Sequence, residues 1–306
     1  MIAVRLVLIV SIGLLAVALG GGGSSAAAQE ATDNATCLAC HTPPGAVMTL
    51  PSTEVVSVTV DPERFAASPH GRVLTCATCH QRNVQIPHPS AGAPSLRAYQ
   101  QRAVAVCATC HADRVAEVAS SVHGRAERMG FAEAPLCTTC HNPHDAARVV
   151  SGAYRNNIPQ LCGSCHADRR LMQKYGLRPV YETYAREFHG VTTTLYKLTR
   201  PQGPAPAAVC TDCHGEHEIR AAADPRSKVH PANLLATCRQ CHPTAGRYFA
   251  TAWTEHRTPS PTDAPLVYYV QLFYRILIPA TVAFLGLLTA LDLGRWAADQ
   301  LRRAER

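Results

Sequence analysis

The chain has 306 residues, with 29 Lys and Arg against 22 Asp and Glu and a formal net charge of +7. Its fourteen cysteines and fifteen histidines are far above the usual content of a soluble enzyme of this length. A reduced cytosolic housekeeping enzyme is therefore not expected. A nucleic-acid-binding protein is not expected either, because the basic residues are spread along the chain instead of forming a patch.

Residues 1–28 have the pattern of a secretory signal peptide. Arg5 precedes an apolar run over 6–19, and the small residues Ala26 to Ala28 offer a cleavage site. The run is short for a transmembrane helix, although an uncleaved N-terminal anchor is the alternative. In either case the following chain is exported, and thiols do not stay reduced there. We predict that residues 29–262 form a periplasmic domain.

All the cysteines occur in CxxCH motifs. Two thiols three residues apart reach the two vinyl groups of one haem, and the adjacent histidine binds its iron as the proximal ligand. A disulfide scaffold would need no histidine after each second cysteine, and zinc sites pair two CxxC motifs in reducing compartments. The sequence therefore predicts seven c-type haems with their iron. The attachment cysteines are Cys37, Cys40, Cys76, Cys79, Cys107, Cys110, Cys137, Cys140, Cys162, Cys165, Cys210, Cys213, Cys238 and Cys241. The proximal ligands are His41, His80, His111, His141, His166, His214 and His242.

Eight further histidines lie outside the motifs, one more than seven six-coordinate haems require. Three of them open tandem repeats, which begin near residues 68, 121 and 187 with the pattern Ser-x-His-Gly or Glu-x-His-Gly. Each repeat continues with a CxxCH motif, another histidine and a second CxxCH motif. The predicted distal ligands are His70, His88, His123, His144, His189, His217 and His256.

His230 is the histidine that this account leaves over. It stands eight residues before the second motif of its repeat, where the other two repeats have Tyr99 and Tyr154. We therefore expect that it does not bind iron.

His144 and His217 each follow a proximal histidine by three residues. We expect each to share a short helix with that histidine, so that it cannot reach the opposite face of the same haem. Each must then ligate a neighbouring haem, which requires the haems to pack in contact.

The expected fold is mainly α with much irregular loop, in which short helices wrap around a haem stack. Helices are predicted at the motifs and at about 112–121, 180–188 and 245–255, the last ending at His256. The proline-rich stretches 86–89 and 201–206 are predicted to be loops, and little sheet is expected.

A transmembrane helix is predicted over 263–294. Its apolar run, 266–291, is long enough to cross a bilayer with some tilt. Tyrosines at one end and Trp296 beyond the other suit the membrane interfaces, and four arginines follow the run. The positive-inside rule places the basic tail, 295–306, in the cytoplasm. Arg275 either snorkels to the outer interface or contacts a partner within the membrane, and Pro279 is a candidate kink.

The motifs over residues 34–256 resemble those of the multihaem c-type cytochromes of bacterial respiration. The Ser-x-His-Gly and CxxCHxxH elements are similar to those of membrane-anchored periplasmic members of the cytochrome c3/c7 and doubled-CxxCH families. The resemblance implies irons ligated by two histidines and an electron-carrying role. Quinol dehydrogenases of the NapC/NirT type carry their anchor at the N-terminus, so their quinone-site residues cannot be transferred to this chain.

The function expected first is an electron-transfer subunit of anaerobic respiration in the bacterial inner membrane, without substrate chemistry of its own. One histidine-free helix makes a poor quinone pocket, so we expect a polytopic membrane partner, such as a cytochrome b or another quinone-reactive protein, together with periplasmic redox proteins. The alternatives are a multihaem reductase of a nitrogen or sulfur oxyanion, which needs an open coordination position, and a structural or filament-forming cytochrome. A reductase is distinguished by high-spin ferric haem that binds substrate.

Overall fold

The computed structural model describes residues 29–30, 33–86, 88, 92–146, 149–178, 180–250 and 256–305. The predicted signal peptide over 1–28 lies outside these residues. The described part is mainly helical with irregular loops and few strands, as the sequence predicts. The chain divides into two compact units. Unit 1 comprises residues 1–112 and 135–147, and unit 2 comprises residues 113–134 and 148–306.

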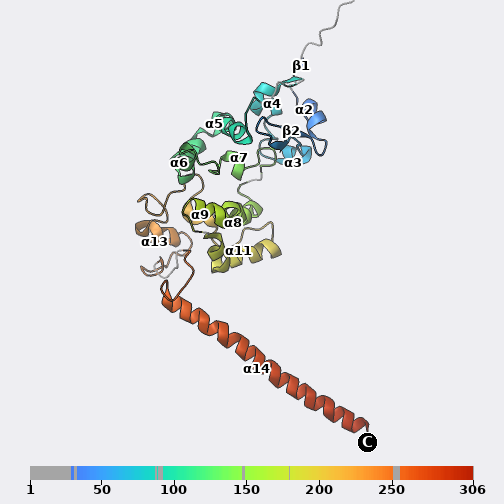
Figure 1. Ribbon diagram of the computed structural model, residues 1–306, viewed down its shortest axis with the longest axis vertical. Coiled ribbons are helices and arrows are strands. Elements are labelled where there is room, and N and C mark those ends of the chain that lie inside the picture. The colour runs from blue at the N-terminus through green and yellow to red at the C-terminus, as the bar shows by residue number, and fades with distance from the viewer. Residues whose placement is uncertain are drawn as a thin grey trace, which may run out of the picture. The chain divides into compact units, whose positions relative to one another are not determined.

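Unit 1 combines short helices with two small antiparallel sheets. Its helices are α2 (Asn34–His41), α3 (Pro62–Ala67), α4 (Cys76–Cys79), η1 (Gln81–Asn83), the first part of α5 (Leu96–Ser120) and α7 (Cys137–Cys140). Strands β2 (Val47–Thr49) and β3 (Val55–Ser57) form a hairpin in which Met48 pairs with Val56. Helices α2, α3 and α4 lie around this hairpin at the blue end of the chain (Figure 1).

The second sheet corrects one prediction. Ile86, expected in a loop, belongs to strand β4 (Gln85–Ile86), which pairs with β1 (Gln29–Glu30). Ile86 precedes a proline, and that position favours extended backbone. Two residues of extended chain suffice for this short pairing. The other proline-rich stretch, 201–206, contains no regular helix or strand, as predicted.

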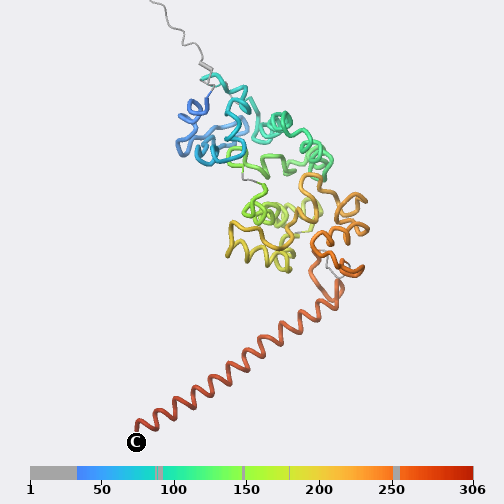
Figure 2. The backbone as a smooth tube through the Cα atoms, turned by 180° about the vertical axis from the view of Figure 1, so that it is seen from behind, coloured from blue at the N-terminus to red at the C-terminus, as the bar shows by residue number. Residues whose placement is uncertain are grey.

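Unit 2 contains the longer helices. They are the second part of α5, α6 (Val122–Arg128), α8 (Gly152–His166), α9 (Arg169–Lys174), α10 (Val180–Arg186), α11 (Phe188–Thr199), α12 (Cys210–His214), α13 (Pro231–Arg239) and α14 (Pro265–Ala304). Helices α8, α10 and α11 pack against one another, and their backbones run side by side in green and yellow in Figure 2. The Tyr184 hydroxyl of α10 lies 3.3 Å from Thr193 Oγ1 of α11 and donates to Ala208 O at 3.0 Å, so it joins these two helices to the segment that follows them.

The protein interior is poor in large apolar side chains. The largest fully buried side chains among the described residues are Val209, Asn156, Thr193, Pro159 and Ser121. Leu, Ile and Phe, which dominate ordinary cores, are missing from that set. Larger apolar side chains such as Leu50, Phe65, Met172 and Leu234 are buried slightly less completely.

Two predicted helices have different bounds from those expected. The helix predicted over 112–121 is the second part of α5, which bends at His111 because this residue is not helical (φ −116°, ψ 40°). The helix predicted over 180–188 ends at Arg186, and α11 starts afresh at Phe188. The helix predicted over 245–255 does not begin at 245, because residues 247–249 form a turn and Ala250 is in a 3₁₀ conformation; residues 251–255 lie outside the described residues.

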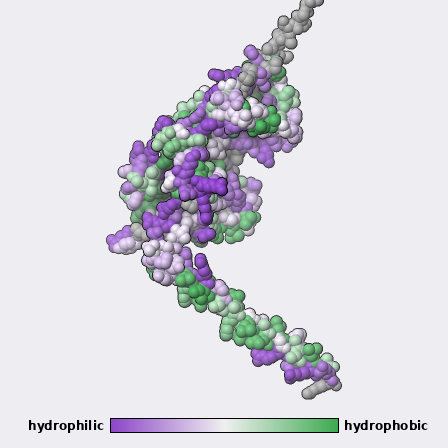
Figure 3. Space-filling view, viewed as in Figure 1, coloured by the Kyte–Doolittle hydropathy of each residue, from purple (hydrophilic) through white to green (hydrophobic). Residues whose placement is uncertain are grey.

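Helix α14 is one helix of 40 residues that continues through Pro279 and the predicted basic tail. None of its described residues is buried, and its most apolar stretch has a mean hydropathy of 2.1. Apolar side chains follow most of its length, and polar ones gather toward its C-terminal end (Figure 3), where Asp292, Arg295 and Arg302 lie. By length and composition α14 is able to cross a membrane.

Candidate haem-binding sites

Three CxxCH motifs begin a helix. Helices α4, α7 and α12 start at the first cysteine, and the residue before the second cysteine caps the turn. The Thr139 hydroxyl accepts the Leu136 N–H at 3.1 Å, and the Asp212 carboxylate accepts the Val209 N–H at 2.7 Å. These bonds satisfy backbone donors that a helix start leaves without an intrahelical partner. The cap holds the two thiols on one turn of helix.

The other motifs lie toward the end of a helix. Helices α2 and α8 end at the motif histidines His41 and His166, α13 ends inside its motif, and α5 bends at His111. In two of these motifs the hydroxyl before the second cysteine donates backward, from Ser164 to Leu161 O and from Thr109 to Val106 O, both at 2.7 Å. The two settings alternate along the chain, so the repeat in the sequence is also a repeat in local structure.

The Ser-x-His-Gly pattern has a packing reason. A Cβ atom on its glycine would lie about 2 Å from the carbonyl oxygen six residues earlier, a distance that no side chain tolerates. The distances are 1.9 Å for Gly71 to Phe65 O, 2.1 Å for Gly124 to Val118 O, and 2.1 Å for Gly190 to Tyr184 O. The serine caps the same turn, because Ser121 Oγ accepts the Gly124 N–H at 3.1 Å. Together these contacts fix the backbone that carries the intervening histidine.

Six pairs of histidine rings lie close together, two of them nearly parallel and four tilted. Three pairs are in unit 1 and three in unit 2. Their ring centroids are 5.9 Å apart in His41–His88, 6.2 Å in His70–His111, 5.8 Å in His80–His144, 6.3 Å in His123–His166, 6.3 Å in His189–His242 and 6.4 Å in His214–His256. Each pair joins one histidine of a CxxCH motif with one predicted distal ligand.

The spacing fits an iron ion between the rings. A metal–imidazole bond is about 2 Å long and the ligating nitrogen lies about 1 Å from its ring centroid, so two axial rings are roughly 6 Å apart. Ordinary aromatic pairs also occur at such distances. Ordinary pairing, however, gives no reason why every one of the six pairs should combine a motif histidine with a distal one.

Burial prepares these imidazoles for metal binding. It lowers the pKa of His214 to about 4, and the neighbouring His256 contributes. Burial is also the first cause of a lowered pKa at His80, His123, His144, His166, His189 and His256. An iron ligand must be the neutral imidazole, and a lowered pKa favours that form.

Backbone carbonyls contact the second nitrogen of several rings. The Nδ1 atom lies 2.8 Å from Val58 O in His41, 3.1 Å from Gln85 O in His88, and 3.4 Å from Pro143 O in His70. An Nδ1–H that donates to a carbonyl fixes the tautomer and leaves Nε2 for the iron. The sequence alone gives no signal for these partners.

The local setting of His144 and His217 differs from the prediction. Helix α7 ends at Cys140 and α12 at His214, so neither residue shares a helix with the proximal histidine before it. His144 lies in a turn and meets His80, the histidine of a different motif. The remaining predicted ligands, His141 and His217, belong to unit 1 and unit 2 respectively.

His230, the histidine left over, has a structural role. It is the N-cap of α13, and its Nδ1 accepts the Ala232 N–H at 3.2 Å. A ring held in this way satisfies a backbone donor at the helix start.

Neighbouring motifs meet at their first cysteines. The thiols of Cys37 and Cys76, of Cys107 and Cys137, and of Cys162 and Cys210 lie close together. The neighbouring thiol lowers the pKa of Cys137 and raises that of Cys107, and in the other pair it lowers the pKa of Cys162 and raises that of Cys210. None of the fourteen cysteines is buried, so a haem has access to every attachment sulfur. Haems attached at these paired motifs would be neighbours.

A known family matches the second half of this arrangement. The family described as outer membrane cytochrome MtrC/MtrF-like, domains II/IV, matches residues 132–260, which include the last four CxxCH motifs. The chain is a multihaem c-type cytochrome. No curated protein and no solved structure matches it. The residues of the cytochrome suit c-type haem, which supplies a redox-active iron, and its role is electron transfer.

Proposed function

We propose that the cytochrome binds seven haems, each ligated by two histidines, and carries electrons between a quinone-reactive membrane partner and periplasmic redox proteins. The six histidine pairs carry this proposal, because each pairs a motif histidine with a distal one at the spacing that an iron ion requires. We also propose that this cytochrome is related to the cytochrome c3/c7 and doubled-CxxCH families.

Two histidines per iron favour electron transfer over catalysis. A reductase of a nitrogen or sulfur oxyanion needs an open coordination position for its substrate. With both axial positions filled, the protein's contribution is to place the haems and tune their potentials.

Contacts between motifs support conduction in chain order. Within unit 1 the Cys37–Cys76 and Cys107–Cys137 contacts link the first motif to the second and the third to the fourth, and Cys79 lies near Cys110 between them. Within unit 2, Cys162 contacts Cys210, and Cys213 lies near Cys238. Successive haems in each unit are thus attached at adjacent sulfurs.

Helix α14 is the proposed membrane anchor. It is apolar and presents no buried face to its own unit, so the protein itself gives this surface no apolar environment. Tyr268 and Tyr269 near its start and Arg302 and Arg303 near its end suit the outer and inner interfaces respectively. We therefore place the haem domain in the periplasm and the C-terminus in the cytoplasm.

The anchor brings one particular haem close to the membrane. His256, which pairs with His214, is followed by α14 from Pro265 onward. At about 3.5 Å per residue, this short connection spans roughly 30 Å at most. The haem on Cys210 and Cys213 is therefore the proposed site of exchange with the quinone-side partner, and the N-terminal haems exchange with soluble partners. The alternative is a stack parallel to the membrane, with all haems similarly close.

Quinol-driven reduction of two variants tests this polarity. In membranes that contain the partner, His256→Ala is expected to slow the reduction of all the haems by quinol. His70→Ala is expected to leave the initial rate of haem reduction by quinol unchanged. If quinol reduced the haems of His256→Ala rapidly but no longer reduced those of His70→Ala, the N-terminal haems would be the ones that exchange electrons with the quinone-side partner.

Spectroscopy and mass spectrometry test the haem set. Oxidised cytochrome is expected to give only low-spin ferric signals by EPR, and its mass is expected to exceed that of the mature chain by seven haems. A high-spin signal that responds to nitrite, hydroxylamine or a sulfur oxyanion would instead indicate the reductase.

A further inference from the structure

A carboxylate lies beside the second nitrogen of one predicted distal ligand. Glu117 Oε2 is 3.7 Å from His217 Nδ1, in unit 2. Both side chains are partly buried, with 35% and 27% of their surface exposed. This separation is longer than a hydrogen bond of about 2.9 Å, so the bond forms only if the two side chains approach each other.

The backbone on both sides of this contact is fixed. The Val122 N–H donates to Ile219 O at 2.9 Å, and Arg220 Nη2 is 3.5 Å from Ser120 Oγ. These contacts join the end of α5 to the segment that follows His217. The approach of Glu117 to His217 is thus set by two further contacts within a few residues.

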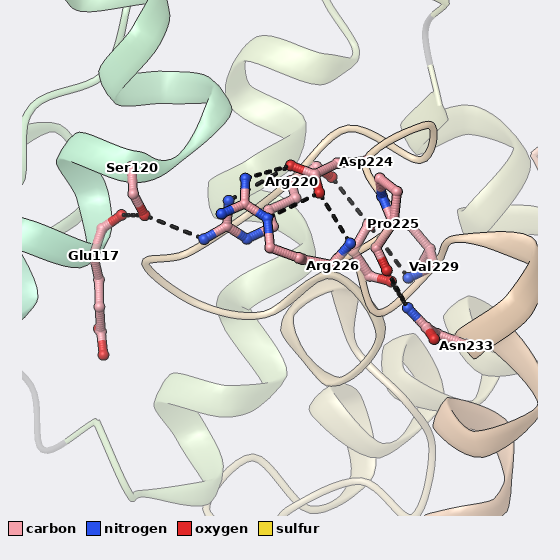
Figure 4. A network of polar contacts seen from close by, with 9 residues as sticks. Glu117, Ser120, Arg220, Asp224, Pro225, Arg226, Val229 and Asn233 are labelled. Carbon is pink, nitrogen blue, oxygen red and sulfur yellow. Dashed lines mark hydrogen bonds and ion pairs between the residues drawn. The ribbon is translucent and has the colours of Figure 1, made fainter.

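A polar network supports this segment. Arg220 pairs with Asp224 at 3.6 Å, where only 16% and 14% of the side chains are exposed, and Asp224 also binds Arg226. Asn233 donates to Pro225 O at 2.8 Å and anchors the loop to α13. In Figure 4 this network lies on one side of α5, and the Glu117 side chain points away from it. The network therefore holds the loop, and the Glu117 carboxylate is not part of it.

Arg114 orients the carboxylate. Its Nη1 donates to Glu117 Oε1 at 3.0 Å and to Oε2 at 2.8 Å. Half of the Arg114 side chain is exposed, so water screens its charge. The bond to Arg114 restricts the rotamer of Glu117 one helical turn away.

The acceptor at His217 differs in kind from the others. His41, His70 and His88 have neutral backbone carbonyls at Nδ1, and His256 has the Thr183 hydroxyl at 3.4 Å. An ionised acceptor makes a hydrogen bond roughly twice as strong as a neutral one. A carboxylate partner also makes a metal-bound imidazole more basic, and a more basic ligand favours ferric over ferrous iron.

We propose that Glu117 accepts the Nδ1 proton of His217 and thereby holds one haem at a lower reduction potential than a neutral acceptor would. Glu117 is a positioning residue that acts through His217. The inference rests on the proposed role of His217 as an iron ligand.

A potentiometric titration of full-length Glu117→Gln tests the proposal. Glutamine keeps the shape and the acceptor oxygen but removes the charge. One midpoint potential is expected to rise by ~59 mV, while the others stay in place. For a one-electron couple this shift corresponds to about a tenfold change in the ferrous-to-ferric ratio. By EPR, one low-spin signal is expected to shift its g values and to remain low-spin.

Asp113→Asn is the matched control. Asp113 also pairs with Arg114, at 3.5 Å, and is 69% exposed, so this variant removes the same charge without touching the contact with His217. It is expected to leave every midpoint unchanged. Equal shifts in Asp113→Asn and Glu117→Gln, or no shift in Glu117→Gln, would overturn the proposal.

His217→Ala separates this inference from the proposed function. If His217 is an iron ligand, this variant gives one high-spin haem whether or not Glu117 tunes it. An unchanged low-spin spectrum would refute the ligand assignment and the tuning proposal with it. A high-spin signal with an unshifted Glu117→Gln titration would refute the tuning alone.

Discussion

The glycine that follows each histidine at the start of a repeat determines the local backbone that positions the imidazole ring. The glycine after His123 lies against the carbonyl of Val118, because the chain turns back on itself just before the helix that Ser121 caps. Only a residue without Cβ permits that approach. The small residue next to each opening histidine is thus a packing requirement of the turn, and the ring direction follows from it.

Gly124→Ala tests this requirement. The new Cβ would stand 2.1 Å from Val118 O, so the backbone has to shift and carry His123 away from His166. We expect a stability loss of about 1–3 kcal/mol in denaturant unfolding and a new high-spin ferric signal. Gly246→Ala, where the new Cβ has nothing within 4 Å, is the control and should change neither quantity. A low-spin, fully stable Gly124→Ala would show that the turn tolerates a side chain.

The surplus histidine is tested by exchange with the residue found in the other repeats. His230→Tyr should leave every haem low-spin, because His230 caps α13 through Nδ1. Loss of that cap should cost about 1 kcal/mol of unfolding free energy. His144→Ala should produce one high-spin haem, since His144 faces His80. A high-spin EPR signal in His230→Tyr would mean that the repeat alignment is wrong.

At the scale of elements, the motifs alternate between helix starts and helix ends. A motif at a start depends on a cap from its own third residue, whereas a motif at an end extends a helix that already exists. Helix α7, of four residues, is too short to persist by itself. Its cap and its covalent haem should therefore dominate its stability.

Variants of two neighbouring threonines in α7 distinguish the stabilisation by the cap from that by the rest of the motif. Thr139 Oγ1 accepts the Leu136 N–H, whereas Thr138 Oγ1 is buried and has no hydrogen-bond partner among the described residues. Thr139→Val is expected to lower the unfolding free energy of the haem-loaded protein by about 1 kcal/mol. Thr138→Val, of the same shape, should be neutral or stabilising because it removes an unsatisfied hydroxyl. Equal effects of the two variants in denaturant melts would argue against the cap.

At the scale of the whole molecule, α14 is set apart by its lack of buried contacts. Its described residues contribute nothing to the interior of unit 2, although the helix accounts for 40 residues. Its removal should thus leave the haem-bearing part intact.

A chain that ends at residue 262 is expected to reach the soluble periplasmic fraction with its full haem spectrum. The full-length protein should remain in the inner-membrane fraction through a high-salt wash, because an apolar helix, unlike a surface charge, is not released by salt. Retention of the shortened chain on the membrane would locate the anchor elsewhere.

Much of the haem chemistry could be read from local spacing. Two thiols and a histidine within five residues constrain one another through the covalent chain, so the predicted attachment sites and proximal ligands rest on no tertiary information. The same holds for the apolar stretch that becomes α14. The helix that was expected to carry both His141 and His144 does not form, because the cap of α7 stabilises only one turn.

The sequence by itself determined the seven CxxCH motifs, the surplus of one histidine among the candidate distal ligands and the apolar C-terminal helix, because these depend on residues close together in the chain. Only the tertiary structure decided that His70, His123 and His189 each meet the second motif of their own repeat, while His256 returns to His214. Those partners are dozens of residues apart, and their meeting depends on the path of the whole intervening chain. The contact between Glu117 and His217 could not be predicted from the sequence for the same reason, because the two residues are distant in the chain and only the fold brings them together.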